Sequence, residues 1–494
     1  MEGRRLSSQP GWRTKLALGV GVTLLACVTM LRDLGSPAAP IWDEAYYLTS
    51  AARYREGRVQ FASHPPLGLM LIAAGQELSG LNRGLDLHPL ARVKSAGAEL
   101  VPKGYDFAGV RLASALFGVL VVLSAYLLVL AATAEPFGAA GAAAMLAFET
   151  AFAAQFRAAH LDSFQVAFGL VALGGSLGMQ RTRGTAQIAW SCVAGAGVGA
   201  AGMVKADGLL LAVAPALAVM PMLLRGWRRP ATWIAAAICG GTSAAACLSV
   251  VVLVFLAHVE SGRKTLDYGA PAAAKDARYV SPAYQQFLER GRALSPRVLL
   301  AAAVDYGRFM AADLKGMARS DPNGSPPLLQ PLGSKPINYR WDSDGRTTSY
   351  VQLVPNPVNW AASLASIIAS LVVIAIAIRR PSIGAKGRAV VLAGALIVWL
   401  VMTVVHAWLG SGRVMYLYHH FIGLVVGILT IPLIVEAMSS IDSRFARRRG
   451  VVTAGLVAAS ACAFVWWSPL AYHRPLSHAA CFARTIPLPM VACR

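Results

Sequence analysis

Long apolar segments recur along this chain, separated by short polar turns and by two longer polar stretches. A helix needs roughly 20 apolar residues to cross about 30 Å of hydrocarbon, and several of the segments reach that length. Each must be helical, because the bilayer core holds no water to hydrogen-bond a bare backbone. The pattern predicts eleven spans, over residues 15–32, 107–133, 137–155, 161–180, 186–203, 207–224, 231–258, 358–378, 388–408, 416–437 and 451–468.

The composition supports a membrane protein. Hydrophobic residues fill 56% of the 494 positions and charged residues only 14%, whereas a soluble domain carries roughly 25% charged residues. We therefore predict an all-α polytopic membrane protein with about 11 transmembrane helices, outward juxtamembrane helices and a small helix-plus-hairpin outer loop. The first span is expected to be a retained anchor, since no convincing small-residue cleavage site follows it.

The formal net charge of +21 is concentrated in five short clusters beside the spans. With eleven spans all five clusters fall on one side, which the positive-inside rule makes cytoplasmic. The N-terminus is then cytoplasmic and the C-terminus outside. Short clusters that flank helices favour loop anchoring over nucleic-acid binding. The clusters are Arg4, Arg5, Arg13 and Lys15; Arg181 and Arg183; Arg225, Arg228 and Arg229; Arg379, Arg380, Lys386 and Arg388; and Arg444, Arg447, Arg448 and Arg449.

Two outward segments, residues 33–106 and 259–357, are too long to be simple connections. In the first, residues 45–56 predict an amphipathic helix at the membrane interface, with Arg53 among the lipid headgroups. Residues 67–78 are apolar but too short to span, which suits a helix that lies along the membrane.

The second outward segment predicts helices over residues 281–294 and 296–315, then a hairpin of 337–341 and 347–353 around Asp344-Gly345. The chain would then comprise four parts, which are an N-terminal bundle (1–258) carrying the loop 33–106, the outer segment 259–357, C-terminal membrane helices (358–468) and an outward tail (469–494).

The seven cysteines have no metal-ligand spacing, so no metal site is assigned. Cys481 and Cys493 lie in the outward tail and could pair in an oxidising compartment.

Asp43 and Glu44 are adjacent acids about ten residues past the first span, on the outward side. A base is needed to take the proton when a hydroxyl attacks a sugar, and an Asp at the mouth of a bundle can act as one. The second acid could hold the acceptor. The alternative is a pair of solvated acids at the membrane interface.

His64 precedes a double proline that fixes a bend and presents the imidazole at the membrane surface. The alternative is an incidental His before a helix start. Arg157 and Asp162 flank the outward turn between the third and fourth spans. Burying either charge in lipid would cost roughly 2.5–3.5 kcal/mol at mid-bilayer. The Arg157 guanidinium suits a phosphate, and the alternative is an Arg157–Asp162 ion pair. Arg111 is a further outward cation at the start of the second span. Lys205 and Asp207, in the outward turn after the fifth span, are either a third contribution to the site or simply the turn's charges.

Arg413 and the run Tyr416 to Phe421 open the tenth span on the outward side. Arg413 could reach a lipid phosphate, and Tyr418 and His420 are candidate binding residues. Adjacent His residues do not share a helix face, so a joint metal site is not expected. Acids for proton removal and cations for phosphate, gathered on the outer side, suit transfer from a polyprenyl-phosphate carrier.

Five motifs in chain order carry a family resemblance. They are Asp43-Glu44 after the first span, His64-Pro65-Pro66-Leu67-Gly68, the Arg157 to Asp162 turn, Pro355-Asn356-Pro357-Val358 and Tyr418-His419-His420-Phe421. By these motifs the chain resembles the dolichyl/polyprenyl-phosphate-mannose protein mannosyltransferases, within the C superfamily of membrane glycosyltransferases. The resemblance implies that Asp43 is the catalytic base, Glu44 contacts the acceptor and Arg157 binds a phosphate or carboxylate.

The chain departs from that family's pattern in two places. Leu69 and Met70 follow Gly68 where family members often carry a Lys, so the phosphate would be held by Lys205, Arg413 or Arg111 instead. The segment before the eighth span is also too short for the large folded insert of eukaryotic relatives, which weakens the case for a protein acceptor.

The predicted function is an inverting glycosyltransferase that moves a hexose, mannose as first candidate, from a polyprenyl-phosphate sugar to an outward acceptor, protein Ser/Thr being favoured. The alternatives are a glycolipid, lipid A or cell-wall polysaccharide acceptor and, from a different class, a transporter. The expected partners are a membrane lipid carrier and a protein or glycan acceptor, without nucleic acid. The expected membrane is a bacterial inner membrane, with the active site on its outer face.

Overall fold

The computed structural model describes residues 10–262, 271–290, 294–379, 386–486 and 493. Three members of the predicted basic clusters, Arg4, Arg5 and Arg380, lie outside these residues.

Nine helices of the described residues are long and apolar enough to cross a membrane. Each coincides with a predicted span. They are α1 (Trp12–Leu31), α5 (Phe107–Thr133), α9 (Thr185–Val204), η2 with α10 (Ala206–Ala212 and Val213–Gly226), α11 (Pro230–Ser261), α15 (Pro357–Arg379), α16 (Lys386–Leu409), η4 with α17 (Leu417–His420 and Phe421–Ile441) and α18 (Ser443–Ala471).

The other two predicted spans are helical as well, but they are more polar or interrupted. One is α8 (Asp162–Arg181), and the other is broken into α6 (Pro136–Ala147) and α7 (Thr150–Gln155). The break falls at Glu149, whose carboxylate accepts hydrogen bonds from Ala151 N and from Asn356 N at 3.1 and 2.8 Å. The buried acid thereby ties the Pro-Asn-Pro entry of α15 to the bundle. The prediction of an all-α polytopic membrane protein is confirmed.

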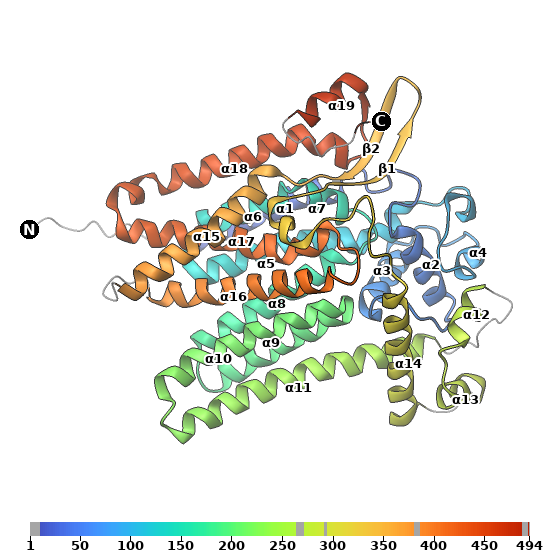
Figure 1. Cartoon of the computed structure of the whole chain (residues 1–494), viewed down its shortest axis with the longest axis horizontal. Helices are drawn as coiled ribbons and strands as arrows, with labels where there is room; N and C mark the ends of the chain where they lie inside the picture. The colour runs from blue at the N-terminus through green and yellow to red at the C-terminus, as the bar shows by residue number, and fades with distance from the viewer. Residues whose placement is uncertain (1–9, 263–270, 291–293, 380–385, 487–492, 494) are drawn as a thin grey trace, which may run out of the picture.

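The bundle has two chemically different ends. Figure 1 shows α2, α3, α4, α12, α13, α14 and the β1–β2 hairpin together at one end, with the α10–α11 and α17–α18 turns at the other. We call the first group the outer cap; its elements are α2 (Glu44–Arg55), α3 (Pro66–Ser79), α4 (His88–Ala91), η1 (Ala98–Leu100), α12 (Pro271–Ala277), α13 (Pro282–Arg290), α14 (Pro296–Lys315), η3 (Pro327–Leu332), β1 (Ile337–Ser343), β2 (Thr347–Leu353), β3 (Pro475–Ser477) and α19 (His478–Thr485).

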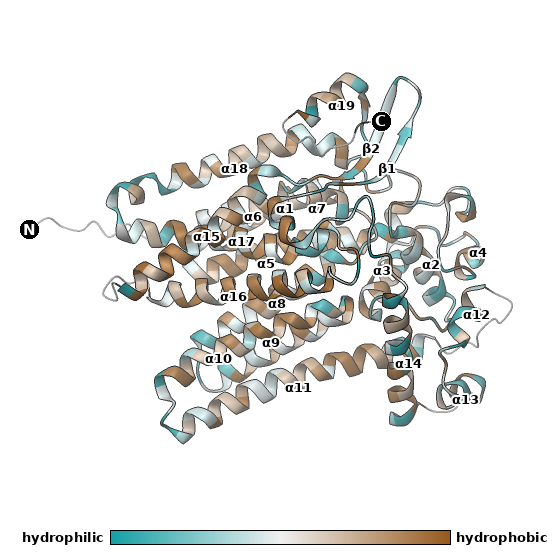
Figure 2. Cartoon of the chain, viewed as in Figure 1, coloured by the Kyte–Doolittle hydropathy of each residue, from teal (hydrophilic) through white to brown (hydrophobic). Residues whose placement is uncertain are grey.

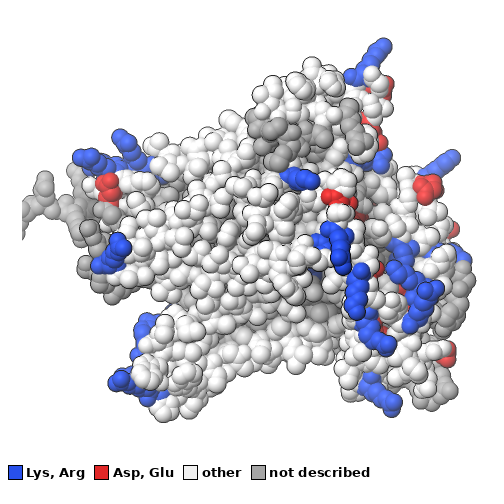
Figure 3. Space-filling view, in the orientation of Figure 1, with Lys and Arg blue, Asp and Glu red and all other residues white. Residues whose placement is uncertain are grey.

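Between the two ends the surface is apolar. Figure 2 shows mainly hydrophobic residues along the long helices, with hydrophilic residues in the turns and in the outer cap. In Figure 3 the Lys, Arg, Asp and Glu side chains gather at both ends and leave the belt between them uncharged. A belt of this kind is what the hydrocarbon of a bilayer requires.

The predicted elements of the outer cap are present at nearly the expected positions. The helices α2, α3 and α14 match the predicted ranges within two residues. The hairpin pairs antiparallel around Gly345, whose φ of 84° is a conformation that glycine adopts freely. The sheet has a third strand that the pattern did not predict, because β3 adds three residues of the tail to β2.

The predicted setting of α2 is wrong. The side chains of Tyr47, Leu48 and Arg53 are buried in protein, not spread over lipid headgroups. The helices α3 and α4 cover them, and Leu48 packs in one cluster with Leu69 and Ile72 of α3. The amphipathic pattern of this helix therefore reflects burial inside the outer cap.

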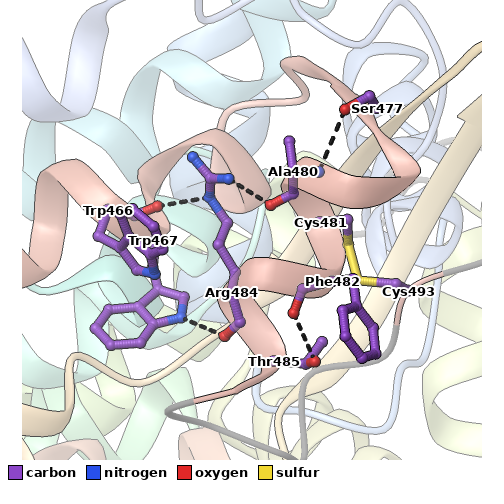
Figure 4. Close-up of a disulfide and its surroundings, with 9 residues drawn as sticks. All are labelled: Trp466, Trp467, Ser477, Ala480, Cys481, Phe482, Arg484, Thr485 and Cys493. Atoms are coloured by element: carbon purple, nitrogen blue, oxygen red, sulfur yellow. Dashed lines mark hydrogen bonds between the residues drawn. A yellow bond between two sulfur atoms is a disulfide. The ribbon is translucent and has the colours of Figure 1, made fainter.

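The tail is fastened by a disulfide between Cys481 and Cys493, with their Cα atoms 5.9 Å apart (Figure 4). Arg484 of α19 donates to Trp466 O at 2.7 Å, which joins this short helix to the end of α18. The pairing of Cys481 with Cys493, which the sequence left open, is thus formed.

Candidate active site

A cavity of about 640 Å³ lies between the outer cap and the membrane helices. It is lined by side chains from α2, α14, the loop after α9 and the start of the tenth predicted span. Among the predicted site residues, the cavity brings together Asp43, His64, Asp162, Lys205, Arg413 and Tyr418. Residues more than 350 positions apart in the chain therefore share one pocket.

Asp43 stands directly before α2, after a sharp turn at Trp42. Trp42 has a φ of 50°, an uncommon conformation for a bulky residue. Two rings hold it there, because Tyr339 stacks on the indole at 5.2 Å between centroids and Tyr416 meets its edge at 5.6 Å. The turn directs the next residue, Asp43, to the cavity wall.

The environment of Asp43 favours a base. Burial raises the pKa of the Asp43 carboxyl above its ordinary value. The neighbouring His160 and Lys205 oppose that rise, and the Asp162 carboxylate adds to it. A carboxylate whose pKa is raised holds a transferred proton better than an exposed Asp does.

Asp162 is paired with Lys205, so the Arg157–Asp162 ion pair that the sequence left as an alternative is not formed. Lys205 Nζ donates to Asp162 Oδ1 at 2.6 Å, and Gln155 Nε2 donates to Asp162 Oδ2 at 2.6 Å. The Gln155 oxygen in turn accepts from the Tyr339 hydroxyl. These contacts fix the ammonium of Lys205 beside the cavity, 5.0 Å from the Tyr418 ring centroid.

Glu44 and Arg111 form a closed ion pair that does not line the cavity. Arg111 is 0% exposed and Glu44 is 1% exposed. The guanidinium spends all its N–H groups on two Glu44 oxygens and on the carbonyls of Leu34, Pro37 and Ala39. It has no donor left for a phosphate.

Glu44 is saturated in the same way. Its oxygens accept from Arg111, from Ile41 N at 2.8 Å and from Ala159 N at 2.7 Å. The expectation that Glu44 contacts the acceptor is therefore contradicted, as is that of Arg111 as a phosphate ligand. Both residues instead fix the loop before Asp43 against α5 and the turn before α8.

Arg157 also lies away from the cavity lining. Its guanidinium donates to Arg32 O at 2.7 Å and Asp33 O at 3.1 Å, and lies 4.2 Å from the Tyr472 ring centroid. The interactions join α7, the end of α1 and the end of α18. The predicted contact of Arg157 with the substrate phosphate finds no support in this arrangement.

Only one of the two adjacent histidines reaches the cavity. His419 lines it and lies 3.3 Å from Arg413 Nη2. His420 is buried between Trp360 and Trp399, with 5.8 Å between ring centroids in each case. Successive residues on a helical turn point in different directions, so the structure places His419, and not the predicted His420, at the cavity.

Arg413 differs from the other cations that line the cavity, because it has no acidic partner within the described chain. Its nitrogen contacts there are Met317 Sδ at 3.5 Å and His419. His64 also lines the cavity, and burial lowers the pKa of its imidazole to about 4, with Lys205 acting in the same direction. His64 is thus neutral at pH 7 and offers a hydrogen bond but no charge.

The partner of Asp207, His406, was missed by the sequence analysis. Asp207 accepts from Gln165 Nε2 at 2.7 Å and lies 3.0 Å from His406 Nε2. His406 could have indicated this contact from the sequence, since an ionisable residue inside a predicted span usually has a polar partner. The pair joins α16 to the loop that carries Lys205.

Comparison with known proteins identifies the family. The fold is shared with polytopic membrane glycosyltransferases of the C superfamily. Residues 20–260 match the family model described as dolichyl-phosphate-mannose-protein mannosyltransferase, and residues 302–486 match that of the C-terminal four-transmembrane region of protein-O-mannosyltransferase. The chain belongs to the protein mannosyltransferase family, and the resemblance inferred from the motifs is confirmed.

Individual relatives match over part of their length. The chain is 32% identical over 166 residues to protein O-mannosyl-transferase 1 of Danio rerio and 34% identical over 156 residues to that of Rattus norvegicus. The matches take in 33% and 31% of this chain, and 22% and 20% of those relatives. The matched segments thus span about a fifth of the relatives' length.

Solved structures share the fold. A chain of the S. cerevisiae protein O-mannosyltransferase Pmt1–Pmt2 complex, bound to the sugar donor, matches with a TM-score of 0.78 and 15% identity, over 96% of this chain and 92% of that one. The archaeal oligosaccharyltransferase AglB of Archaeoglobus fulgidus matches with a TM-score of 0.51 and 13% identity, over 94% and 57% of the two chains. At such identities the likeness concerns the fold alone.

Substitution of Glu44 by Gln is expected to lower the free energy of unfolding by about 3–5 kcal/mol, because it leaves the Arg111 charge buried without its partner. The double variant Glu44→Gln/Arg111→Met should recover part of this loss. Thermal unfolding in detergent measures both. Glu77→Gln is the control, since the half-exposed Glu77 pairs with Arg55 at the surface. A Glu44→Gln protein as stable as the wild type but inactive would restore the acceptor-contact role.

Proposed function

We propose that this chain is an inverting glycosyltransferase that moves mannose from a polyprenyl-phosphate mannose to a Ser or Thr hydroxyl of a protein. The observation that carries the proposal is the shared cavity, in which Asp43 lies with Lys205 and Arg413 from two other parts of the bundle. A base and phosphate-binding cations in one pocket are the two requirements of this transfer.

In the proposed reaction the acceptor hydroxyl attacks the anomeric carbon from the face opposite the phosphate. Asp43 takes the hydroxyl proton as the new carbon–oxygen bond forms. The bond between the anomeric carbon and the phosphate oxygen breaks, and the lipid phosphate leaves with the electron pair. Attack on the opposite face inverts the anomeric configuration.

The charge balance in the cavity favours Arg413 as the main phosphate ligand. The charge of Lys205 is already matched by Asp162 at 2.6 Å, and Arg111 is closed off by Glu44. Arg413 keeps an unmatched charge and a planar array of donors suited to phosphate oxygens. Arg413 would also take over the role of the Lys that family members often carry after Gly68, since the buried Leu69 occupies that place in α3 here.

His64, His419 and Tyr418 complete the proposed donor site as uncharged groups. They line the cavity beside the two cations and can bind sugar hydroxyls or phosphate oxygens without adding charge. A protein acceptor is proposed because the relatives in the comparison are named protein O-mannosyl-transferases. A glycolipid acceptor would use the same donor, so it is the competing outcome of the assay below.

We further propose that the basic turns face the cytoplasm, which puts the cavity on the opposite side of the membrane. The α10–α11 turn, which carries Arg228, and the start of α18, which carries Arg448, lie at the end of the bundle away from the outer cap (Figure 1). The positive-inside rule gives the orientation. A bacterial inner membrane stays a prediction.

Asp43→Asn is expected to reduce turnover by roughly 10²–10⁴-fold, the usual contribution of a general base. The assay supplies purified full-length protein with a panel of polyprenyl-phosphate sugars and a Ser/Thr peptide or a glycolipid, and measures glycosylated product and free polyprenyl phosphate. Asp86→Asn, a change of an exposed acid in the same outer segment, is the control. Undiminished turnover by Asp43→Asn would remove Asp43 from the mechanism.

The pH dependence of turnover should report the ionisation of Asp43. The carboxylate acts only when deprotonated, so activity is full above its pKa and is lost as the pH falls through it. Because burial raises this pKa above its ordinary 3.8, the acid limb should lie above pH 3.8. The measurement is kcat against pH with both substrates saturating. A limb at or below the ordinary value would contradict the proposed environment.

Arg413→Gln is expected to lower kcat about 10²-fold, because a preorganised charge facing the leaving phosphate is lost. Arg413→Lys, which keeps the charge without the planar donors, should retain part of the activity. Arg319→Gln, at an exposed position of the same outer region, serves as control. If Lys205→Gln rather than Arg413→Gln gave the large loss, the assignment of the phosphate ligand would be reversed.

A further inference from the structure

A second basic group lines the same cavity at a distance from Asp43. Its members are Arg53, Lys94 and Lys275. Arg53 stands on α2 ten residues after Asp43, and a helix rises about 1.5 Å per residue, so the two Cα atoms are separated by about 15 Å along the axis. None of the three residues takes part in the reaction proposed above.

Arg53 is buried yet incompletely bonded. The residue is 3% exposed, and its Nη2 donates to Thr49 Oγ1 at 3.2 Å and to Val93 O at 3.1 Å. Its Nε and Nη1 have no hydrogen-bond partner among the described residues. Buried polar groups are normally paired, so two unused donors at a cavity wall point to an absent ligand.

The nearest acid does not satisfy Arg53. Asp276 lies 3.9 Å from Arg53 Nη1, beyond hydrogen-bond distance. The same carboxylate accepts from Lys94 Nζ at 2.5 Å, and Lys94 also donates to Phe61 O at 2.7 Å. One acid thus serves two buried cations, which leaves an excess of positive charge at this end of the cavity.

The neighbouring cations affect the pKa of Lys94. Burial lowers the pKa of its ammonium to about 8, and the Arg53 charge acts in the same direction. Lys275 adds a third cation at the rim, with its Nζ 5.3 Å from the Phe309 ring centroid and 3.5 Å from Asp313. An arriving anion would relieve the repulsion among these groups.

The phosphate of the donor is not the ligand that fits here. During transfer that phosphate is bonded to the anomeric carbon, which the acceptor hydroxyl must approach to about 3–3.5 Å. It therefore has to stay near Asp43, where Lys205 and Arg413 are available. An anion near Arg53 must belong to a longer molecule that also reaches Asp43, and an acceptor polypeptide does so.

We propose that Arg53, supported by Lys94 and Lys275, binds an acidic side chain of the acceptor polypeptide. The inference rests on the protein acceptor proposed above. An extended chain advances about 3.3–3.6 Å per residue, so a separation of about 15 Å corresponds to roughly four residues. The preferred acceptor carries an Asp or Glu about three to five residues from the mannosylated Ser or Thr.

The experiment uses full-length protein and fluorescent peptides that contain one Thr and one Glu, with the Glu moved from one to six residues away on either side. Matched peptides carry Gln instead of Glu. Binding is followed by anisotropy without donor, and transfer by mannosylated product with polyprenyl-phosphate mannose. The wild type should bind and use the best-placed Glu peptide about tenfold better than its Gln counterpart, as expected for one charged hydrogen-bonded pair.

Arg53→Gln should erase this preference while turnover of the Gln peptide stays unchanged, and Arg53→Lys should restore part of it. Arg55→Gln is the matched control, because Arg55 lies on the same helix but contacts Asn82 O and Arg83 O outside the cavity. Lys94→Met is a second variant of the subsite, and size-exclusion chromatography and thermal unfolding verify that each variant is folded.

Three outcomes overturn the inference. One is a wild type without any Glu preference, and another is a folded Arg53→Gln protein that loses both peptides equally. The third is an Arg53→Gln protein that keeps the peptide preference but is inhibited less than the wild type by free polyprenyl phosphate. That result would assign the anion to the donor. Failure of the protein-acceptor proposal looks different, since no peptide would then be mannosylated while a glycolipid acceptor is.

Discussion

The buried ion pair between Glu44 and Arg111 is the constraint on which the site depends. It closes the loop that follows α1 onto α5 and onto the backbone of Ala159, with every hydrogen-bonding position of both side chains in use. A buried pair of this kind is tolerated only when its geometry satisfies both partners. The preceding residue, Asp43, is thereby held at the cavity wall. In the proposed reaction, Glu44 therefore supports the loop and the adjacent Asp43 acts as the base.

The same division applies to the cations near the outer cap. Arg111 and Lys205 have carboxylate partners at 2.8 and 2.6 Å and serve first to hold elements together. Arg413 has no acidic partner within the described chain, and Arg53 has only a distant one. Charges that face a cavity without a partner are available to a ligand, and the two lie in separate regions of one pocket. A long substrate that meets both the lipid carrier and the enzyme is consistent with that spacing.

Much of the fold followed from the pattern of apolar residues, because crossing a bilayer imposes length and hydropathy on each segment separately. All eleven predicted spans are helical, and α14 and the hairpin lie where their patterns indicated. The setting of α2 did not follow, since an amphipathic face looks alike whether it meets lipid or protein. β3 was missed because three residues carry too little pattern, and the break at Glu149 became interpretable only through its contact with Asn356.

By itself, the sequence predicted which residues approach one boundary of the membrane and that acids and cations gather there. It did not determine which charges neutralise one another. Arg157 could have met Asp162, yet Lys205 does so from a different helix pair, and Arg157 instead reaches Arg32 O. Pairing depends on the rotation and lateral position of each helix, which packing fixes and hydropathy leaves free. Tertiary structure alone therefore separated the supporting charges from those left open to a substrate.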